Sequence, residues 1–346
     1  MLTTTTQGPD SFYVPDLETA RSIKKDQLAP EGDFAAIPDL LSERLLQRLD
    51  PLGKTPEVIV DLGCDTVARL TQLRERYPHA LIVGIGWSEN NLPVTTDRLS
   101  RQGKKQSAGA SSGAGPGTTS LGRKLFGWLP GLNVSRHSQE LLVAAAPMVM
   151  PLADNSVDMV IASQLLPWCA NPAAVFSEAH RVLKTEGAFF WSSAGPDTLK
   201  EYRELWRSLD SYPHVWGLRD MHDLGDEMLR CGFDSPVLDR ENLTLQYPGV
   251  EALAAELRAN GLANIAAGRR RGLMARDVMQ RLEGLCGKQR FDVTFELVQG
   301  HGWKKPVQRR QKPNDYNEVT IPADSIKKRI YNQQRIKLPA DTLLPI

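Results

Sequence analysis

Apolar residues follow two patterns along the first part of the chain. Residues 58–60 and 81–85 are short continuous apolar runs, and between them apolar residues recur at helical spacing over residues 67–76. Runs this apolar are typical of strands that are buried on both faces of a parallel sheet. A strand, a helix and a second strand in this order predict a βαβ unit, from which doubly wound sheets are built.

The same alternation continues along most of the chain. A helix is predicted over residues 39–49. The other expected elements are strands over residues 157–162, 188–193, 243–247 and 291–298, helices over residues 173–182, 198–209, 222–231 and 252–258, and a turn over residues 184–187. Residues 291–298 alternate apolar with polar positions, as a half-buried antiparallel strand at a sheet edge does. We therefore predict an α/β fold with a doubly wound, mostly parallel, Rossmann-like sheet and an antiparallel edge strand near the C-terminus.

Three segments lie outside this alternation. Residues 1–38 form a polar lead-in, and residues 304–346 form a basic tail that is rich in Gln and Asn. Residues 101–120 are a low-complexity stretch of Gly, Ser and Ala, which is typical of a flexible insertion. Residues 39–303 are therefore expected to be one domain with an insertion.

The composition of the chain indicates which kinds of partner and which cellular location are expected. The 42 basic and 41 acidic residues nearly cancel, which gives no reason to expect nucleic-acid binding. The N-terminus does not resemble a secretory signal, and no apolar run has the length that spans a bilayer. The four cysteines are far apart, which fits neither a disulfide framework nor a zinc site. We expect a cytoplasmic protein with no metal site and no membrane contact.

The first candidate site is the loop after residues 58–60. In doubly wound sheets, ligands bind beyond the carboxyl ends of the strands, near the switch in strand order. The loop here begins Asp61-Leu62-Gly63-Cys64, and a glycine lets the backbone approach a ligand closely. An acidic residue after the second strand normally binds ribose hydroxyls. These are the general requirements for a nucleoside cofactor.

The sequence motifs resemble those of a known family. Residues 61–64 resemble the first motif of class I S-adenosylmethionine (SAM) methyltransferases, although this motif alone is weakly specific. Later motifs of that superfamily are matched by residues 151–158, 173–176 and 181–184. A closer resemblance, to the biotin-pathway malonyl-acyl-carrier-protein O-methyltransferases, rests on residues 195–203, 213–214, 220–226 and 300–303. It implies an enzyme that methylates the free carboxylate of a malonyl group attached to acyl carrier protein, with SAM as cofactor.

The resemblance also implies which residues hold the cofactor. The expected set is Asp61, Gly63, Cys64, Ser163 and Leu165. Glu89 is added as a substitute for the ribose-binding acid, which is absent after residues 81–85.

Several positions depart from the family pattern on the cofactor side. Asp65 and Val67 replace two glycines of the first motif, Gly86 stands in place of the ribose-binding acid, and residues 144–147 lack the acid expected near adenine. The Asp65 carboxylate is expected to repel the carboxylate of the methionine part of SAM. Together these changes predict weakened cofactor affinity.

The substrate side matches the family better. The resemblance implies that Arg203 pairs with the malonyl carboxylate, for which a guanidinium fork is suited; the alternative is a surface arginine paired with nearby glutamates. His214, Arg219 and His222 are candidates for lining the same pocket. A carboxylate is already ionised at neutral pH, so methyl transfer depends mainly on positioning and we assign no catalytic residue.

Two further local features, a helix start and a run of arginines, can be interpreted as structural or as functional. Asp197 and Thr198 are predicted to cap the helix over residues 198–209, with Glu201 completing a capping box. Residues 269–271 are three consecutive arginines, which form either a docking patch for the acidic carrier protein or a solvated segment.

Two alternative functions stay open at this point. The chain could be a catalytically degenerate methyltransferase fold that binds a carrier protein or a homologous partner subunit, because the departures gather on the cofactor side. A different SAM-fold reaction, such as hydroxylation, ranks last because the sequence offers no set of iron ligands.

Overall fold

The computed structural model describes residues 36–49, 55–63, 67–86, 134–137, 140–260, 262, 264–272, 277–287 and 290–305. The chain divides into two units, Met1–Lys305 and Pro306–Ile346, and all described residues belong to the first. The insertion over residues 101–120, most of the lead-in and most of the tail lie outside the described residues.

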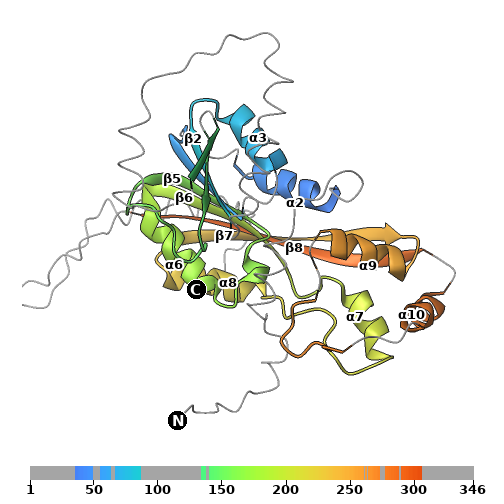
Figure 1. Ribbon diagram of the computed structural model, residues 1–346. Helices are drawn as coiled ribbons and strands as arrows, with labels where there is room; N and C mark the ends of the chain where they lie inside the picture. Colours follow the sequence, from blue (N-terminus) through green and yellow to red (C-terminus); the bar gives the residue numbers. More distant parts are fainter. Residues whose placement is uncertain are drawn as a thin grey trace, which may run out of the picture. The chain divides into compact units, whose positions relative to one another are not determined.

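Within the described residues, one sheet of eight strands has the order β3-β4-β2-β1-β5-β6-β8-β7. The strands are β1 (Val58–Leu62), β2 (Leu81–Gly86), β3 (Val134–His137), β4 (Glu140–Ala144), β5 (Val157–Ser163), β6 (Leu183–Ala194), β7 (Asp234–Tyr247) and β8 (Phe291–Trp303). The five strands from β4 to β6 run parallel, and β3, β7 and β8 are antiparallel to their neighbours (Figure 1). The predicted mostly parallel α/β sheet is confirmed.

The sheet differs from the prediction in three places. The pair β3–β4 was not predicted. In β4 the four apolar residues that follow Glu140 have no decisive period, and pairing with β2 makes this segment a strand. β8 is antiparallel but lies one strand in from the edge, because the longer β7 pairs along it and forms the edge. The turn predicted over residues 184–187 lies inside β6, where the register is irregular and Glu186 has a φ of +65°.

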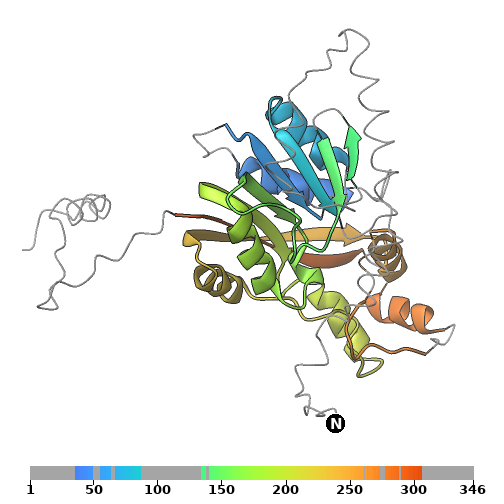
Figure 2. The same ribbon diagram turned by 60° about the vertical axis from the view of Figure 1, so that its left-hand side comes forward.

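Helices cover both faces of the sheet (Figures 1 and 2). The helices are α2 (Ala36–Gln47), α3 (Val67–Arg76), α6 (Pro172–Val182), α7 (Lys200–Arg207), α8 (Met221–Arg230), α9 (Val250–Ala259) and α10 (Val278–Cys286). Alternate residues of β1 point to opposite faces: Ile59 packs with α2 and α3, and Val60 packs with α6 and α8. Strands buried on both faces read as continuous apolar runs, which is why their positions could be predicted.

The far half of the β7–β8 hairpin has its own helical cover. Apolar residues of α7, α9 and α10 form a separate cluster with the hairpin, in which Trp206, Val250 and Leu282 are buried. Helix α10 was not predicted from the sequence. This cover extends beyond the parallel strands and brings α7 next to the end of β6.

The motif over residues 300–303 has a packing explanation. Gly300 and Gly302 of β8 leave room for large side chains on one face of the sheet: a Cβ at position 300 would lie 2.5 Å from Cε2 of Trp191, and one at position 302 would lie 2.9 Å from Cε of Met228. Trp191 and Met228 are fully buried and hydrogen-bonded to each other. The glycines of this motif are therefore required by the core.

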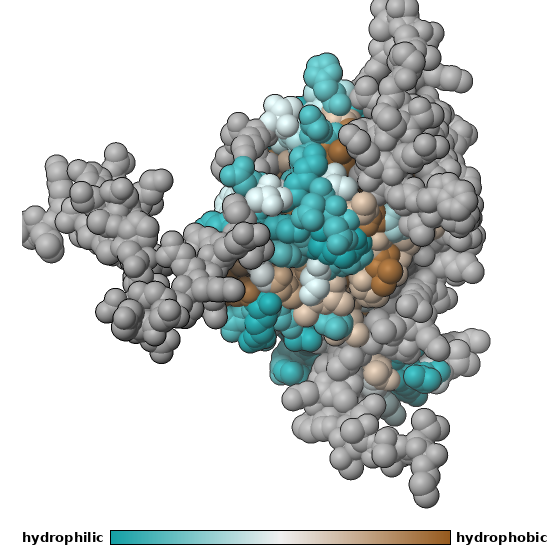
Figure 3. Space-filling view, turned by 90° about the vertical axis from the view of Figure 1, so that its left-hand side faces the viewer, coloured by the Kyte–Doolittle hydropathy of each residue, from teal (hydrophilic) through white to brown (hydrophobic). Residues whose placement is uncertain are grey.

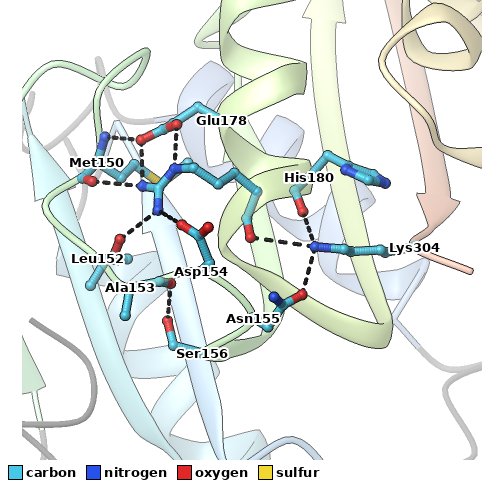
Figure 4. A network of polar contacts seen from close by, with 10 residues as sticks. Met150, Leu152, Ala153, Asp154, Asn155, Ser156, Glu178, His180 and Lys304 are labelled. Atoms are coloured by element: carbon cyan, nitrogen blue, oxygen red, sulfur yellow. Dashed lines mark hydrogen bonds and ion pairs between the residues drawn. The ribbon is translucent and has the colours of Figure 1, made fainter. Parts of the chain in front are cut away.

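Residues that match the later motifs of the superfamily form a polar network where β5 begins (Figure 4). The five N–H groups of the Arg181 guanidinium bind the Glu178 and Asp154 carboxylates and the main-chain oxygens of Met150 and Leu152. These contacts hold the pKa of Arg181 above its ordinary value, chiefly through Glu178. Lys304, which the sequence placed in the tail, donates to Asn155 and to the main chain of α6. The network fixes the entry into β5 at the end opposite to the candidate site.

Few large hydrophobic side chains among the described residues are exposed. Figure 3 shows hydrophilic side chains over the centre of the visible face, and the large hydrophobic residues that are exposed are Val149, Tyr212, Leu229, Val237 and Leu285. No helix among the described residues combines the length and apolar character that a membrane span requires.

Candidate functional site

The strand order changes direction between β1 and β5. From β1 the chain continues to β2 on one side, whereas β5 and β6 lie on the other side. The register pairs Leu62 with both Ile85 and Ala162, so the carboxyl ends of β2, β1 and β5 meet at one edge. Doubly wound sheets bind their ligands at such a switch point. The candidate site is therefore the edge between Gly63 and Ser163.

Gly63 and Leu165 are neighbours at this edge, and their assignment to the cofactor stays a prediction. Gly63 has a φ of +70°, its N–H donates to Ile85 O at 2.8 Å, and a Cβ at this position would lie 3.3 Å from Cδ1 of Leu165. A side chain at position 63 would thus be strained and would press on Leu165. Leu165 itself is buried in the core beneath the turn.

The end of β5 and the residue that follows it are tied to β6 beside Gly63. The Ser163 and Ser192 hydroxyls lie 3.4 Å apart. Gln164, with a φ of +52°, donates from its main chain to Ser192 O at 2.9 Å. Ser163 is therefore at the switch point and partly buried, and its predicted role in cofactor binding stays a prediction.

Asp61 is fully buried and forms an ion pair that the sequence analysis did not identify. Arg69 of α3 donates from Nε to Oδ1 and Oδ2 of Asp61 at 2.9 and 3.0 Å, and from Nη2 to Gly63 O at 3.0 Å. Arg69 precedes the buried Leu70 in α3, and its own side chain is buried as well. The signal that could have revealed this ion pair was a charged residue next to an apolar position of α3, the helix that follows β1.

Two of the departures from the family pattern lie side by side. Gly86 pairs with Ala144 at the carboxyl ends of β2 and β4, and Ala145 N–H donates to Gly86 O at 3.0 Å. The position that lacks the ribose-binding acid and the position that lacks the acid near adenine are thus neighbours at the carboxyl ends of β2 and β4. Cys64, Asp65 and Glu89 lie outside the described residues, so their assigned roles stay predictions.

The predicted capping box on α7 is wrong. The N-cap position is Leu199, with a φ of +59° and no side-chain cap. Thr198 Oγ1 instead contacts the main chain of Glu296 at 3.1 and 3.2 Å, and the Glu201 carboxylate accepts from Thr294 N and Oγ1 at 2.9 and 2.6 Å. These bonds keep the pKa of Glu201 below its ordinary value, against the opposing effect of burial. Contacts with β8 replace the local cap because the loop lies directly against that strand.

Glu296 anchors the loop that follows β6. Its buried carboxylate accepts from Asp197 N at 2.7 Å and lies 3.4 Å from Arg240 Nη1. A Cβ at position 195 would lie 2.5 Å from Oε2 of Glu296, so Gly195 is needed for this approach. The segment over residues 195–199, which matches the family closely, is thus held in one conformation at the edge where β6 ends.

The predicted substrate residues lie in different settings. Arg203 of α7 donates to Pro196 O, which keeps its head group beside the anchored loop. His214 stacks on Trp206 with ring centroids 3.6 Å apart and contacts Asp210 Oδ1 at 2.9 Å; burial lowers its pKa below the ordinary value, so its neutral form is favoured. Arg219 and His222 are exposed, and each contacts an acidic residue of the α8 region, Glu227 and Asp220 respectively.

The basic run over residues 269–271 is close to these residues. Arg270 acts electrostatically on His214, and Asn264 Nδ2 donates to Pro213 O at 2.5 Å. Ile265 and Ala266 pack against Trp168 and Trp216, and Trp168 belongs to the turn η3 (Leu166–Trp168) that follows β5. The side chains of Arg270 and Arg271 are exposed at the surface. The run therefore lies near the carboxyl end of β5 and not at a remote surface.

Among the described residues, no group of His, Cys, Asp and Glu has the arrangement that would hold a metal ion. The described edge instead offers a side-chain-free turn at Gly63, an apolar residue beneath it and two hydroxyls. This set suits an organic ligand bound largely through close backbone approach.

The sequence is similar to known proteins over most of its length. The family described as Methyltransferase domain matches residues 130–191. A malonyl-acyl-carrier-protein O-methyltransferase of Laribacter hongkongensis is 34% identical over 315 residues, which cover 90% of this chain and 96% of the relative. Proteins of the same name from Gallionella capsiferriformans and Nitrosospira multiformis are 36% identical over 265 residues and 33% identical over 291 residues, covering 75% and 82% of this chain and 81% and 89% of theirs.

Proposed function

The chain belongs to the malonyl-acyl-carrier-protein O-methyltransferase family, and on this premise we propose that it methylates the free carboxylate of a malonyl group carried by acyl carrier protein. The observation that carries the proposal is the similarity to such enzymes over 90% of this chain and 96% of one relative. The cofactor of this reaction is SAM, which supplies a methyl group activated on a sulfonium. The proposal places the reaction in the cytoplasm.

The described part of the cofactor edge fits SAM. Gly63 has a left-handed φ of +70°, and a turn without a side chain lets the backbone approach a nucleoside cofactor closely. We assign Asp61, Gly63, Ser163 and Leu165 to holding the cofactor there. Ser163 offers a hydroxyl, whereas Asp61 and Leu165 act from beneath by fixing the turn.

The chain contributes positioning to the reaction. The malonyl carboxylate is ionised at neutral pH and attacks through oxygen, so no side chain has to remove a proton. Arg203 is proposed to orient that carboxylate, with the loop over residues 195–199 as its support. His214 packs against Trp206, which lies on α7 as Arg203 does. His214 is proposed to line the pocket, together with Arg219 and His222 nearer the surface.

The acidic carrier protein is proposed to dock on the exposed Arg270 and Arg271. Their position near η3 places them beside the end of β5, and opposite charges increase the rate of encounter. A homologous partner subunit stays a prediction.

The proposal is tested by calorimetric titration with SAM and S-adenosylhomocysteine, followed by a methyl-transfer assay on malonyl-loaded carrier protein. We expect binding at ligand concentrations of about 100 µM, within the usual range for enzyme substrates, and transfer that depends on the malonyl group. Acetyl-loaded carrier protein is the matched control because it lacks the free carboxylate. The absence of binding, or equal labelling of both carrier proteins, would refute the proposed function.

Arg203→Met is expected to lower kcat/KM for malonyl-loaded carrier protein by roughly ten- to hundredfold, because one charge-assisted interaction is worth about 1.5–3 kcal/mol. SAM affinity should not change. Arg207→Met is the control, since Arg207 lies one turn further along α7, has 67% of its side chain exposed and pairs with Glu204 of the same helix. Equal kcat/KM values for the two variants would contradict the role of Arg203.

A further inference from the structure

Arg69 is a charged residue placed in the interior beside the cofactor turn. Only 3% of its surface is exposed, and its partner Asp61 is fully buried. Burying either charge alone is strongly unfavourable, so the two are compatible with the core only as a pair. The Asp61–Arg69 ion pair is therefore part of the folded core, and its function follows from its position beside Gly63.

The contacts of Arg69 are directed at the turn itself. Nε contacts both carboxylate oxygens of Asp61, and Nη2 contacts Gly63 O, so one planar group holds the residues on both sides of Leu62. A guanidinium has its donors in a fixed fork, which restricts the relative placement of the groups that it binds. A lysine ammonium in this place would carry the charge without that geometry.

Gly63 is thereby fixed from three directions. Arg69 binds its carbonyl from α3, Ile85 accepts its N–H from β2, and Leu165 packs beneath it after β5. Asp65 and Val67 follow this turn at positions where the family pattern has glycines. Side-chain anchoring by Arg69 provides a different means of holding the turn.

We propose that Arg69 is a positioning residue for SAM: it holds the Asp61–Gly63 turn in the conformation that the cofactor binds, and it neutralises Asp61. This inference rests on the proposed function. Because SAM carries a free carboxylate in its methionine part, neutralising Asp61 also removes a repulsive charge from beneath the site. Arg69 does not touch the reacting atoms, so its effect appears in cofactor affinity and not in the acceptor KM.

Four variants separate positioning from general stabilisation. Arg69→Met removes the contacts with Asp61 and Gly63 and leaves the Asp61 charge unpaired. Arg69→Lys keeps the positive charge at position 69 without the guanidinium fork. The double variant Asp61→Asn/Arg69→Met removes both charges, so it stays measurable where the single variant fails to fold. Arg76→Met is the matched control, since Arg76 lies on the same helix and binds Leu46 O, away from the turn.

The readouts are the thermal midpoint, the SAM dissociation constant by calorimetry, hydrogen exchange of the Gly63 amide in the ligand-free protein, and the acceptor KM. For the double variant we expect a midpoint close to that of the parent protein, faster exchange at Gly63 and SAM binding at least tenfold weaker, which corresponds to about 1.4 kcal/mol. Arg69→Lys should be intermediate, and the acceptor KM should stay within about threefold, or 0.65 kcal/mol.

Two outcomes would overturn the inference. The first is a folded double variant that binds SAM as the parent does, which would make the pair a stabilising element only. The second is an equal loss of SAM affinity in Arg76→Met, which would indicate a general effect of weakening α3. A parent protein that binds no SAM would instead refute the proposed function, so the two failures are distinguishable.

Discussion

Replacing Gly300 by alanine is expected to lower the free energy of unfolding by about 3 kcal/mol, at the upper end of the usual cost of overpacking. The added Cβ would lie 2.5 Å from Cε2 of Trp191 and 2.7 Å from Cδ2 of Leu238. Trp191 cannot retreat easily, because it is fully buried, packs against Phe176 and donates to Met228 Sδ. With a total stability of about 5–15 kcal/mol for typical domains, this loss is large.

Thermal and denaturant unfolding measure the effect, and we expect the midpoint to fall by roughly 6–12 °C. Gly284→Ala is the control, since Gly284 lies in the exposed part of α10 and a Cβ there meets nothing within 4 Å. That substitution should stabilise the protein by about 0.5–1 kcal/mol through helix propensity. A Gly300→Ala midpoint equal to that of the parent would show that Trp191 has room to move, and the packing argument for the motif would fail.

Arg181→Met is expected to cost about 2–4 kcal/mol of stability, because it leaves the main-chain carbonyls of Met150 and Leu152 without the guanidinium donor and takes two of the donors from the Glu178 carboxylate, which keeps the Met150 N–H. Those groups are held at 2.7–3.0 Å in the native protein, and the network is visible in Figure 4. Only a third of the Arg181 side chain is exposed, so water replaces the lost bonds incompletely. The loop before β5 should loosen as well, with faster hydrogen exchange at Asn155 and Ser156, which donate to the end of α6.

Two variants serve as comparisons for Arg181→Met: a conservative substitution at the same position, and removal of an exposed arginine elsewhere. Arg181→Lys keeps the positive charge but not the five-donor fork, and should recover only part of the loss. Arg207→Met removes an exposed ion pair with Glu204 and should change stability by no more than about 0.5 kcal/mol. If Arg181→Met were no more destabilising than Arg207→Met, the network would contribute nothing measurable to the fold.

The position of the candidate edge was partly predictable, because the strands that end there read as continuous apolar runs. Gly63 and Leu165 follow β1 and β5, which pair in parallel and so end at the same edge, and their assignment to the cofactor stays a prediction. Arg69 was missed because a single arginine in a helix is usually at the surface, and only the packing of α3 on β1 places it next to Asp61. On the substrate side, Glu296 was missed because it lies almost a hundred residues from the loop that it anchors.

The sequence by itself determined the order of most strands and helices, the parallel character of the central sheet and the family of the chain, but it missed β3, β4 and α10. Those properties follow from local apolar periodicity and from motifs that lie within a few neighbouring residues. The tertiary structure decided the rest: β7 forms the edge outside β8, β8 contacts replace the cap of α7, and Arg69 neutralises Asp61. Each of these depends on contacts between segments that pack together only in the folded chain, and such contacts outweigh local preferences because they satisfy buried polar groups.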